Sequence, residues 1–182
     1  MKMTGGIGIL FSLGIIILLA GCKGQQASPV SEGDVDMSIQ ISSTAFSEGG
    51  KIPRIYTCDD QNVSPPLSWT GVPTNTVSLA LIMDDPDARG TWVHWVLYNL
   101  PVETTILEQG KTGGGTGGTS DFKKPGYGGP CPPRGENHHY YFKLYALDSK
   151  LDLKPGATKT QVESAMGGHI LAQGQLMGIY GR

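Results

Sequence analysis

The chain has 182 residues and a formal net charge of −2, with 14 Lys and Arg against 16 Asp and Glu. This length suits one domain with a sizeable core, and the charge balance argues against a nucleic-acid partner, which usually meets a basic stripe. With 27 Gly, 12 Pro and only 16% charged residues, the composition predicts a turn-rich, strand-leaning domain rather than a helical bundle.

The first 22 residues have the pattern of a secretory signal. Lys2 gives a short positive region, and residues 7–20 are apolar but too short for a comfortable membrane span. The Leu-Ala-Gly run before Cys22 resembles the lipobox of bacterial lipoproteins, in which the peptide is cut before an acylated cysteine. Several acyl chains anchor a protein stably where one would not. We expect a lipoprotein signal peptide at 1–22 with lipidation at Cys22; an ordinary signal peptide or a retained transmembrane anchor is the alternative.

Residues 23–36 are polar and rich in Gly, Ser and Gln, which predicts a flexible tether to a domain at 37–182. The domain would then be anchored to a membrane of a bacterial cell envelope and face an extracytoplasmic space. In that compartment a disulfide between Cys58 and Cys131 is one expectation. Two unpaired thiols are the other, because sequence does not show whether the Cα atoms lie within bonding range.

Three strands are expected in the first half of the domain. Apolar and polar residues alternate at 37–41, which predicts an opening strand buried on one face. Residues 64–69 (SPPLSW) predict an edge strand, because proline removes donors from the hydrogen-bond ladder. Residues 77–83 (VSLALIM) are nearly all apolar and predict a central strand covered on both faces.

The second half adds two long strands and one helix. Strict alternation over 91–100 places four side chains on one face: Trp92, His94, Val96 and Tyr98. A third strong strand at 140–147 groups His139 with Tyr141 if it begins by His139. A helix is expected at 159–166, capped by Thr158 or Thr160, and a short final strand at 179–180. This order predicts a mainly β sandwich or an α+β domain.

Polar residues gather beside these elements. Asp85 and Asp87 flank a proline after the buried strand, His94 lies in the next strand, and His139 and Tyr141 open a later one. Imidazole and phenol groups beside carboxylates can form a hydrogen-bonding cradle for an anion. Each residue also has a structural explanation, since Asp caps turns and a mid-strand histidine is often a satisfied core residue.

Two other chemistries compete for the same residues. Two histidines and an aspartate could form a facial metal triad, but there is no His-x-His, His-x-Asp or i, i+4 histidine pair. Nucleophilic catalysis lacks a Gly-x-Ser-x-Gly motif, and Cys131 has no evident base. Acid–base chemistry by Asp and His stays open. We predict no metal site and no cofactor.

Several motifs follow one another in a fixed order along the domain. They are residues 56–58 (YTC), 62–69 (NVSPPLSW), 85–88 (DPDA), His94, 126–133 (GYGGPCPP), His139-x-Tyr141 and 144–148 (LYALD). Together they resemble the phosphatidylethanolamine-binding protein family, also called Raf kinase inhibitor-like proteins, and its bacterial branch above all. The resemblance covers roughly residues 38–182.

The resemblance implies a β-sandwich of two antiparallel sheets with a shallow anion pocket. Carried over by motif, the pocket would hold Asp85, Asp87, His94, His139 and Tyr141, with Pro132 and Pro133 at its rim. Such pockets accept phosphate, phosphorylethanolamine headgroups or acetate-like anions. Many relatives have proline where this chain has Arg89, which would add a phosphate contact or lie in a solvated turn.

We therefore expect a lipid-anchored binding protein for a small phosphorylated or carboxylated ligand. Because Asp85 and Asp87 repel a dianion, affinity should rise as the pH falls from about 8 towards 6 and a histidine becomes protonated. A protein-interaction inhibitor of a protease or kinase, with an unknown protein partner, is a second interpretation. A phosphoester hydrolase that uses Asp and His as acid and base is a third.

Overall fold

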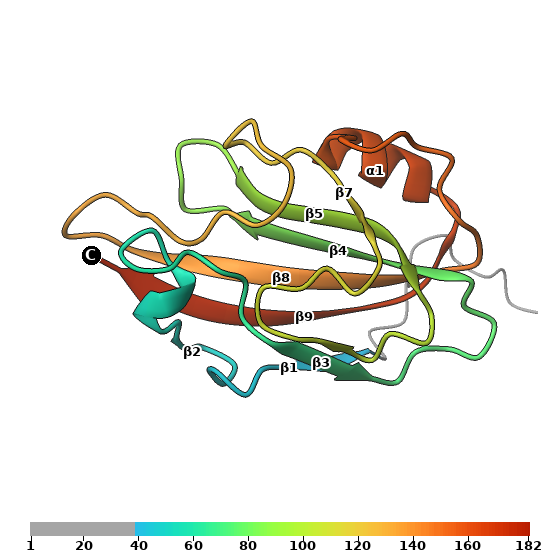
Figure 1. Ribbon diagram of the computed structural model, residues 1–182, viewed down its shortest axis with the longest axis horizontal. Helices are drawn as coiled ribbons and strands as arrows, with labels where there is room; N and C mark the ends of the chain where they lie inside the picture. Colours follow the sequence, from blue (N-terminus) through green and yellow to red (C-terminus); the bar gives the residue numbers. More distant parts are fainter. Residues whose placement is uncertain (1–38) are drawn as a thin grey trace, which may run out of the picture. The chain divides into compact units, whose positions relative to one another are not determined.

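The computed structural model describes residues 39–182, so the predicted signal peptide, the lipidation site Cys22 and the tether lie outside the described residues. The described part is mainly β, with two sheets and one short α-helix (Figure 1). Within it, no helix is both long enough and apolar enough to cross a membrane.

The larger sheet has six strands. In spatial order these are β2 (Gly50–Lys51), β9 (Ile170–Gly181), β8 (Asn137–Leu147), β4 (Ser78–Asp85), β5 (Trp92–Pro101) and β7 (Thr116–Gly117). Neighbouring strands are antiparallel apart from the parallel pair β2 and β9. The smaller antiparallel sheet consists of β1 (Gln40–Ser42), β3 (Leu67–Thr70) and β6 (Ile106–Leu107). The predicted two-sheet β-sandwich is confirmed.

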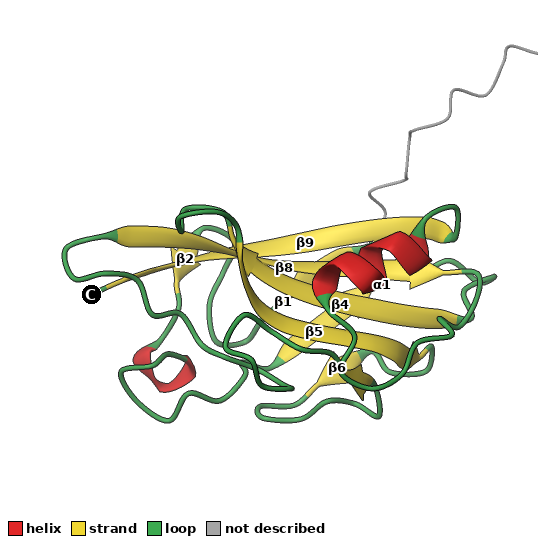
Figure 2. Cartoon of the chain, turned by 90° about the horizontal axis from the view of Figure 1, so that it is seen from above, coloured by secondary structure: helices red, strands yellow, loops and turns green. Residues whose placement is uncertain are grey.

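The large sheet is covered on both faces, and β4 runs through its middle. On one face, Leu79, Leu81 and Met83 pack into the core shared with the small sheet. On the other, Ala80 and Ile82 pack beneath α1 (Lys159–Met166), which lies over that face (Figure 2). Every residue of β4 is buried, which confirms the prediction of a central strand covered on both faces.

The helix begins and ends where the sequence indicates. Thr158 caps it in a reciprocal pair of bonds: its hydroxyl accepts from the Gln161 N–H at 3.4 Å, and the Gln161 side chain accepts from the Thr158 N–H at 2.9 Å. Gly167 follows the last helical residue, and Val162 and Met166 bury the inner face. The predicted helix at 159–166 is confirmed.

The last strand is longer than expected, because β9 begins nine residues before the predicted segment 179–180. Its glycines weaken the strand pattern in the sequence, but they are required for close packing. A Cβ at Gly174 would overlap the Ile39 carbonyl group, and a Cβ at Gly178 would lie 2.6 Å from the Ile52 side chain. The glycines therefore let neighbouring segments lie directly on the strand.

Cys58 and Cys131 form a disulfide, with their Cα atoms 5.4 Å apart. Cys58 follows the short 3-10 helix η1 (Arg54–Tyr56), and Cys131 lies in the loop before β8. Of the two alternatives that the sequence leaves open for these cysteines, the structure contains the bridge. It ties together segments that are 73 residues apart in the chain.

Candidate functional site

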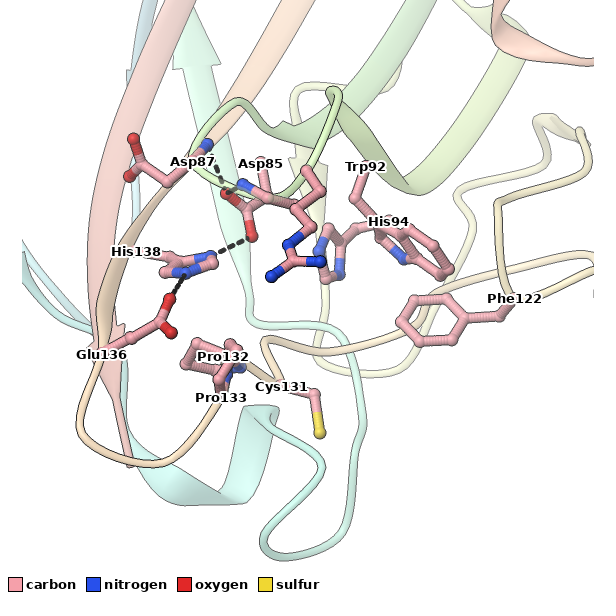
Figure 3. Close-up of a pocket in the computed structure, with 12 residues that line it drawn as sticks. Asp85, Asp87, Trp92, His94, Phe122, Cys131, Pro132, Pro133, Glu136 and His138 are labelled. Atoms are coloured by element: carbon pink, nitrogen blue, oxygen red, sulfur yellow. Dashed lines mark hydrogen bonds and ion pairs between the residues drawn. The ribbon is translucent and has the colours of Figure 1, made fainter.

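A pocket of about 590 Å³ opens where the end of β4 and the starts of β5 and β8 meet their loops (Figure 3). Its lining combines charged, aromatic and proline side chains: Asp85, Asp87, Ala88, Arg89, Trp92, His94, Phe122, Cys131, Pro132, Pro133, Glu136 and His138. Five of the seven predicted ligand-binding residues are therefore brought together here. Their role in binding stays a prediction.

Asp85 is held from two sides. It is the last residue of β4 and only 3% exposed. One carboxylate oxygen accepts from the N–H groups of Asp87 at 2.9 Å and Ala88 at 3.2 Å, and the other lies 2.7 Å from Nδ1 of His138. The first pair of bonds is the turn-capping role that aspartate often plays before such loops. Both oxygens are thus already engaged by donors of the protein.

His138 lies between two carboxylates, as Figure 3 shows. Its Nδ1 faces Asp85, and its Nε2 lies 3.1 Å from a carboxylate oxygen of Glu136. Burial acts to lower the pKa of His138, but the bonds to the two carboxylates outweigh burial and raise that pKa above its usual value. Because an ionised carboxylate only accepts, the arrangement favours an imidazolium ring that donates from both nitrogens.

A β-bulge directs His94 to the pocket. Trp95 pairs with Met83 and Val93 pairs with Asp84, so His94 is an extra residue without a partner across the strand pair. The bulge places His94 on the pocket side and shifts the alternation that follows. Val96 and Tyr98, which strict alternation groups with His94, instead join the core under α1. The predicted shared face of these residues is wrong because a bulge resets the two-residue period.

His94 has the opposite electrostatic character to His138. The ring is 3% exposed, and its Nδ1 donates to the Gly128 carbonyl oxygen at 2.7 Å. Burial lowers the pKa of His94 in spite of this bond. The ring is therefore neutral near pH 7, with its proton on Nδ1 and its acceptor lone pair on Nε2.

His139 and Tyr141 do not line the pocket, which corrects their predicted place. Successive side chains of a strand point to opposite faces, and His138 and Tyr140 take the pocket side of β8. His139 instead donates from its backbone N–H and from Nδ1 to Asp87, at 2.8 and 2.7 Å. These bonds hold the pKa of Asp87 below its usual value.

The sequence contained a signal for the correct face. Phe142, Leu144 and Ala146 are apolar and in phase with His138, whereas Lys143 is in phase with His139. Because a buried face is apolar, this phase assigns His138 to the inside. The pocket also contains Glu136 and Phe122, for which the sequence has no comparable signal.

Tyr140 lies behind the pocket and contacts its histidines. Its ring meets His94 edge to face at a centroid distance of 5.2 Å and is stacked near His138 at 6.5 Å. Its hydroxyl is buried and has no well-formed hydrogen bond within residues 39–182, although the Cys131 backbone faces it. Burial raises the pKa of Tyr140 well above its usual value, so the hydroxyl keeps its proton and can donate.

The charged side chains of the pocket differ in whether they have a partner within the protein. Arg89 lines the pocket, is exposed, and forms no ion pair in the described part of the chain, whereas Asp85, Asp87 and Glu136 each accept from a histidine. No group of three or more His, Cys, Asp or Glu side chains between residues 39 and 182 is placed to hold a metal ion.

Comparisons with known proteins agree with this architecture. The sequence profile described as phosphatidylethanolamine-binding protein matches residues 42–181. A UPF0098 protein of Methanothermobacter thermautotrophicus is 49% identical over 151 residues, which cover 79% of this chain and 99% of the relative. A UPF0098 protein of Pyrococcus horikoshii is 44% identical over 177 residues, covering 92% of this chain and 85% of the relative.

Two solved structures are similar as well. A phosphatidylethanolamine-binding protein homolog from Chlamydia trachomatis has a TM-score of 0.75 and 41% identity, covering 81% of this chain and 99% of the homolog. The E. coli protein YbcL, described as a member of the mammalian family, has a TM-score of 0.74 and 30% identity, covering 80% and 99% of the two chains.

Proposed function

Because the chain belongs to the phosphatidylethanolamine-binding protein family, we propose that it is a lipid-anchored binding protein whose pocket captures the phosphoryl or carboxylate group of a small ligand. The observation that carries the proposal is the state of the charges around the pocket. Arg89 is free to pair with an anion, whereas the three pocket carboxylates are already hydrogen-bonded to histidines.

This arrangement reduces the repulsion that Asp85 and Asp87 would exert on an anionic ligand. Each carboxylate accepts bonds from backbone N–H groups and from a histidine, so part of its negative charge is compensated locally. An imidazolium at His138 adds positive charge beside the cavity. Arg89 then supplies a planar guanidinium whose donors match two oxygens of a phosphate or carboxylate.

Calorimetric titration of the full chain with methyl phosphate tests the proposal. We expect Arg89→Gln to weaken binding by about tenfold or more, because a hydrogen bond to a charged group contributes about 1.5–3 kcal/mol. Lys150→Gln is the matched control, since Lys150 is exposed beyond the far end of β8 and should bind like the parent protein. Equal affinity of the Arg89 variant and the parent protein would remove Arg89 from the site and leave the proposal without its main support.

The membrane anchor is proposed from the sequence alone. Cys22 follows the Leu-Ala-Gly run, and its acylation would hold the domain at the surface of a bacterial envelope membrane. Metabolic labelling with a palmitate analogue should mark the parent protein and not Cys22→Ser. Equal labelling of both proteins, or of neither, would contradict the anchor and leave the pocket proposal intact.

A further inference from the structure

Two aromatic side chains of the pocket are unusually open to solvent. Trp92 is 39% exposed and Phe122 is 37% exposed, although most large apolar side chains of the described residues are buried. Both line the pocket, and their rings meet edge to face with centroids 5.6 Å apart (Figure 3). Exposed apolar surface inside a cavity indicates a contact that a ligand completes.

Trp92 and Phe122 form an aromatic wall of the pocket, and the backbone around Phe122 holds this wall in place. Asp121, next to Phe122, donates its N–H to the Val93 carbonyl oxygen at 3.0 Å and accepts from the Val93 N–H at 2.8 Å. A Cβ at Gly128 would overlap the Phe122 ring, so the ring lies directly on the glycine backbone. A ligand therefore meets a preorganised surface and does not have to order it.

The aromatic wall adjoins the polar part of the pocket. Phe122 lies edge to face with His94 at a centroid distance of 5.4 Å, and Arg89 lines the same cavity. A volume of about 590 Å³ is well above what a bare phosphate or acetate ion fills, and it falls in the range of pockets for drug-sized ligands, roughly 300–1,000 Å³. The space beyond the anion is thus bounded by aromatic rings.

We infer that the ligand carries a flat aromatic ring next to its anionic group, as an aryl phosphate or an aryl carboxylate does. The anion pairs with Arg89, and the ring packs against Trp92 and Phe122 in the edge-to-face or offset geometry that aromatic pairs prefer. The inference rests on the proposed anion pocket and adds the chemical class of the molecule that fills it.

Three phosphate monoesters test the inference by calorimetry on the full chain. Methyl phosphate reports the anion contact, phenyl phosphate adds the ring, and n-hexyl phosphate adds the same number of carbons as a flexible chain. We expect phenyl phosphate to bind about tenfold tighter than methyl phosphate, and clearly tighter than hexyl phosphate. In Phe122→Leu, which keeps an apolar side chain over Gly128, the ratio of phenyl to methyl affinity should fall towards one.

Ile106→Ala is the matched control, because Ile106 is an exposed apolar residue outside the pocket at 61% exposure. It should keep the parent ratio of affinities. Equal binding of methyl and phenyl phosphate would overturn the aromatic inference alone. Hexyl phosphate binding as tightly as phenyl phosphate would overturn it too and would indicate a lipid-like ligand. If none of the three esters binds, the proposed anion pocket fails, and this inference fails with it.

Discussion

Two neighbouring aspartates at the end of β4 face opposite sides of the same sheet. Asp84 is 1% exposed on the helix side, where Nζ of Lys143 and Nζ of Lys159 lie 2.9 and 2.8 Å from its oxygens. Asp85 is 3% exposed on the pocket side, where its partners are backbone N–H groups and His138. The residue type and the burial are the same, and only the partners and the surroundings differ.

The partners of Asp84 and Asp85 distinguish a carboxylate that stabilises the fold from one that belongs to the pocket. Burial acts to lower the pKa of Lys159, but its bond to Asp84 outweighs burial and raises that pKa, so Lys159 keeps its charge near neutral pH. The partner of Asp85 is a histidine, whose charge changes near neutral pH. The ion pair on the helix side therefore does not depend on pH near neutrality, whereas the pair on the pocket side contains a histidine that titrates beside a cavity.

Removing the disulfide is the largest change available on the pocket side. The bridge closes a 73-residue separation, and loop-closure entropy then predicts a loss of about 4 kcal/mol in the free energy of unfolding for Cys58→Ala with Cys131→Ala. Urea unfolding of the parent and double variant measures it, and added reductant should affect only the parent. An oxidised parent no more stable than the double variant would show that the bridge does not hold the pocket rim to the domain.

Asp84→Asn should give the next largest effect, this time on the helix side. Removing the carboxylate leaves two lysines facing a buried amide, and because their side chains are 20–31% exposed we expect a loss of about 2–3 kcal/mol. Chemical unfolding measures the loss, with exposed Asp152→Asn as the control. The ratio of ligand affinities at pH 6 and pH 8 should not change. A change in that ratio would mean that the two sides of β4 are coupled and not independent.

The parts of the molecule that the sequence predicts well are those with a continuous local pattern. Residues 79–83 of β4 are an unbroken apolar run, and the helix at 159–166 has a capping threonine and terminal glycines. The sequence predicts only the end of β9, because glycines that serve close packing look like breaks in a strand. These glycines are needed because Ile39 and Ile52, which are more than 120 residues away in the chain, pack directly against them.

The sequence predicts the candidate site less completely, for a similar reason. The Asp-Pro-Asp turn and the prolines at 132–133 are local features, and Asp85, Asp87 and these two prolines line the pocket. The bulge at His94 depends on pairing with β4, and the choice of His138 over His139 depends on which face of β8 is covered. Phe122 lies in a turn without any periodic pattern, so its place depends on its contacts with Trp92, His94 and Gly128.

The two pocket histidines give the smallest expected effect on stability. They still test the difference between the two sides of β4, because their pKa values are shifted in opposite directions. The pKa of His138 is raised in the folded protein. Its contribution to stability is therefore fully present when the pH is below the pKa of an unfolded histidine, about 6.5, and it is lost as the pH rises through the folded pKa. The lowered pKa of His94 means that its contribution is present above about pH 6.5 and is lost as the pH falls through the folded pKa.

Stability measured by urea unfolding between pH 5 and pH 8.5 separates these contributions. The difference between the parent protein and His138→Gln should shrink as the pH rises, whereas the difference between the parent and His94→Gln should grow. Asp84→Asn should lower the whole curve without changing its slope, since lysines do not titrate in this range. If both histidine variants changed the slope with the same sign, the two rings would share one electrostatic environment. Asp85 would then not be the carboxylate that distinguishes the pocket side of β4.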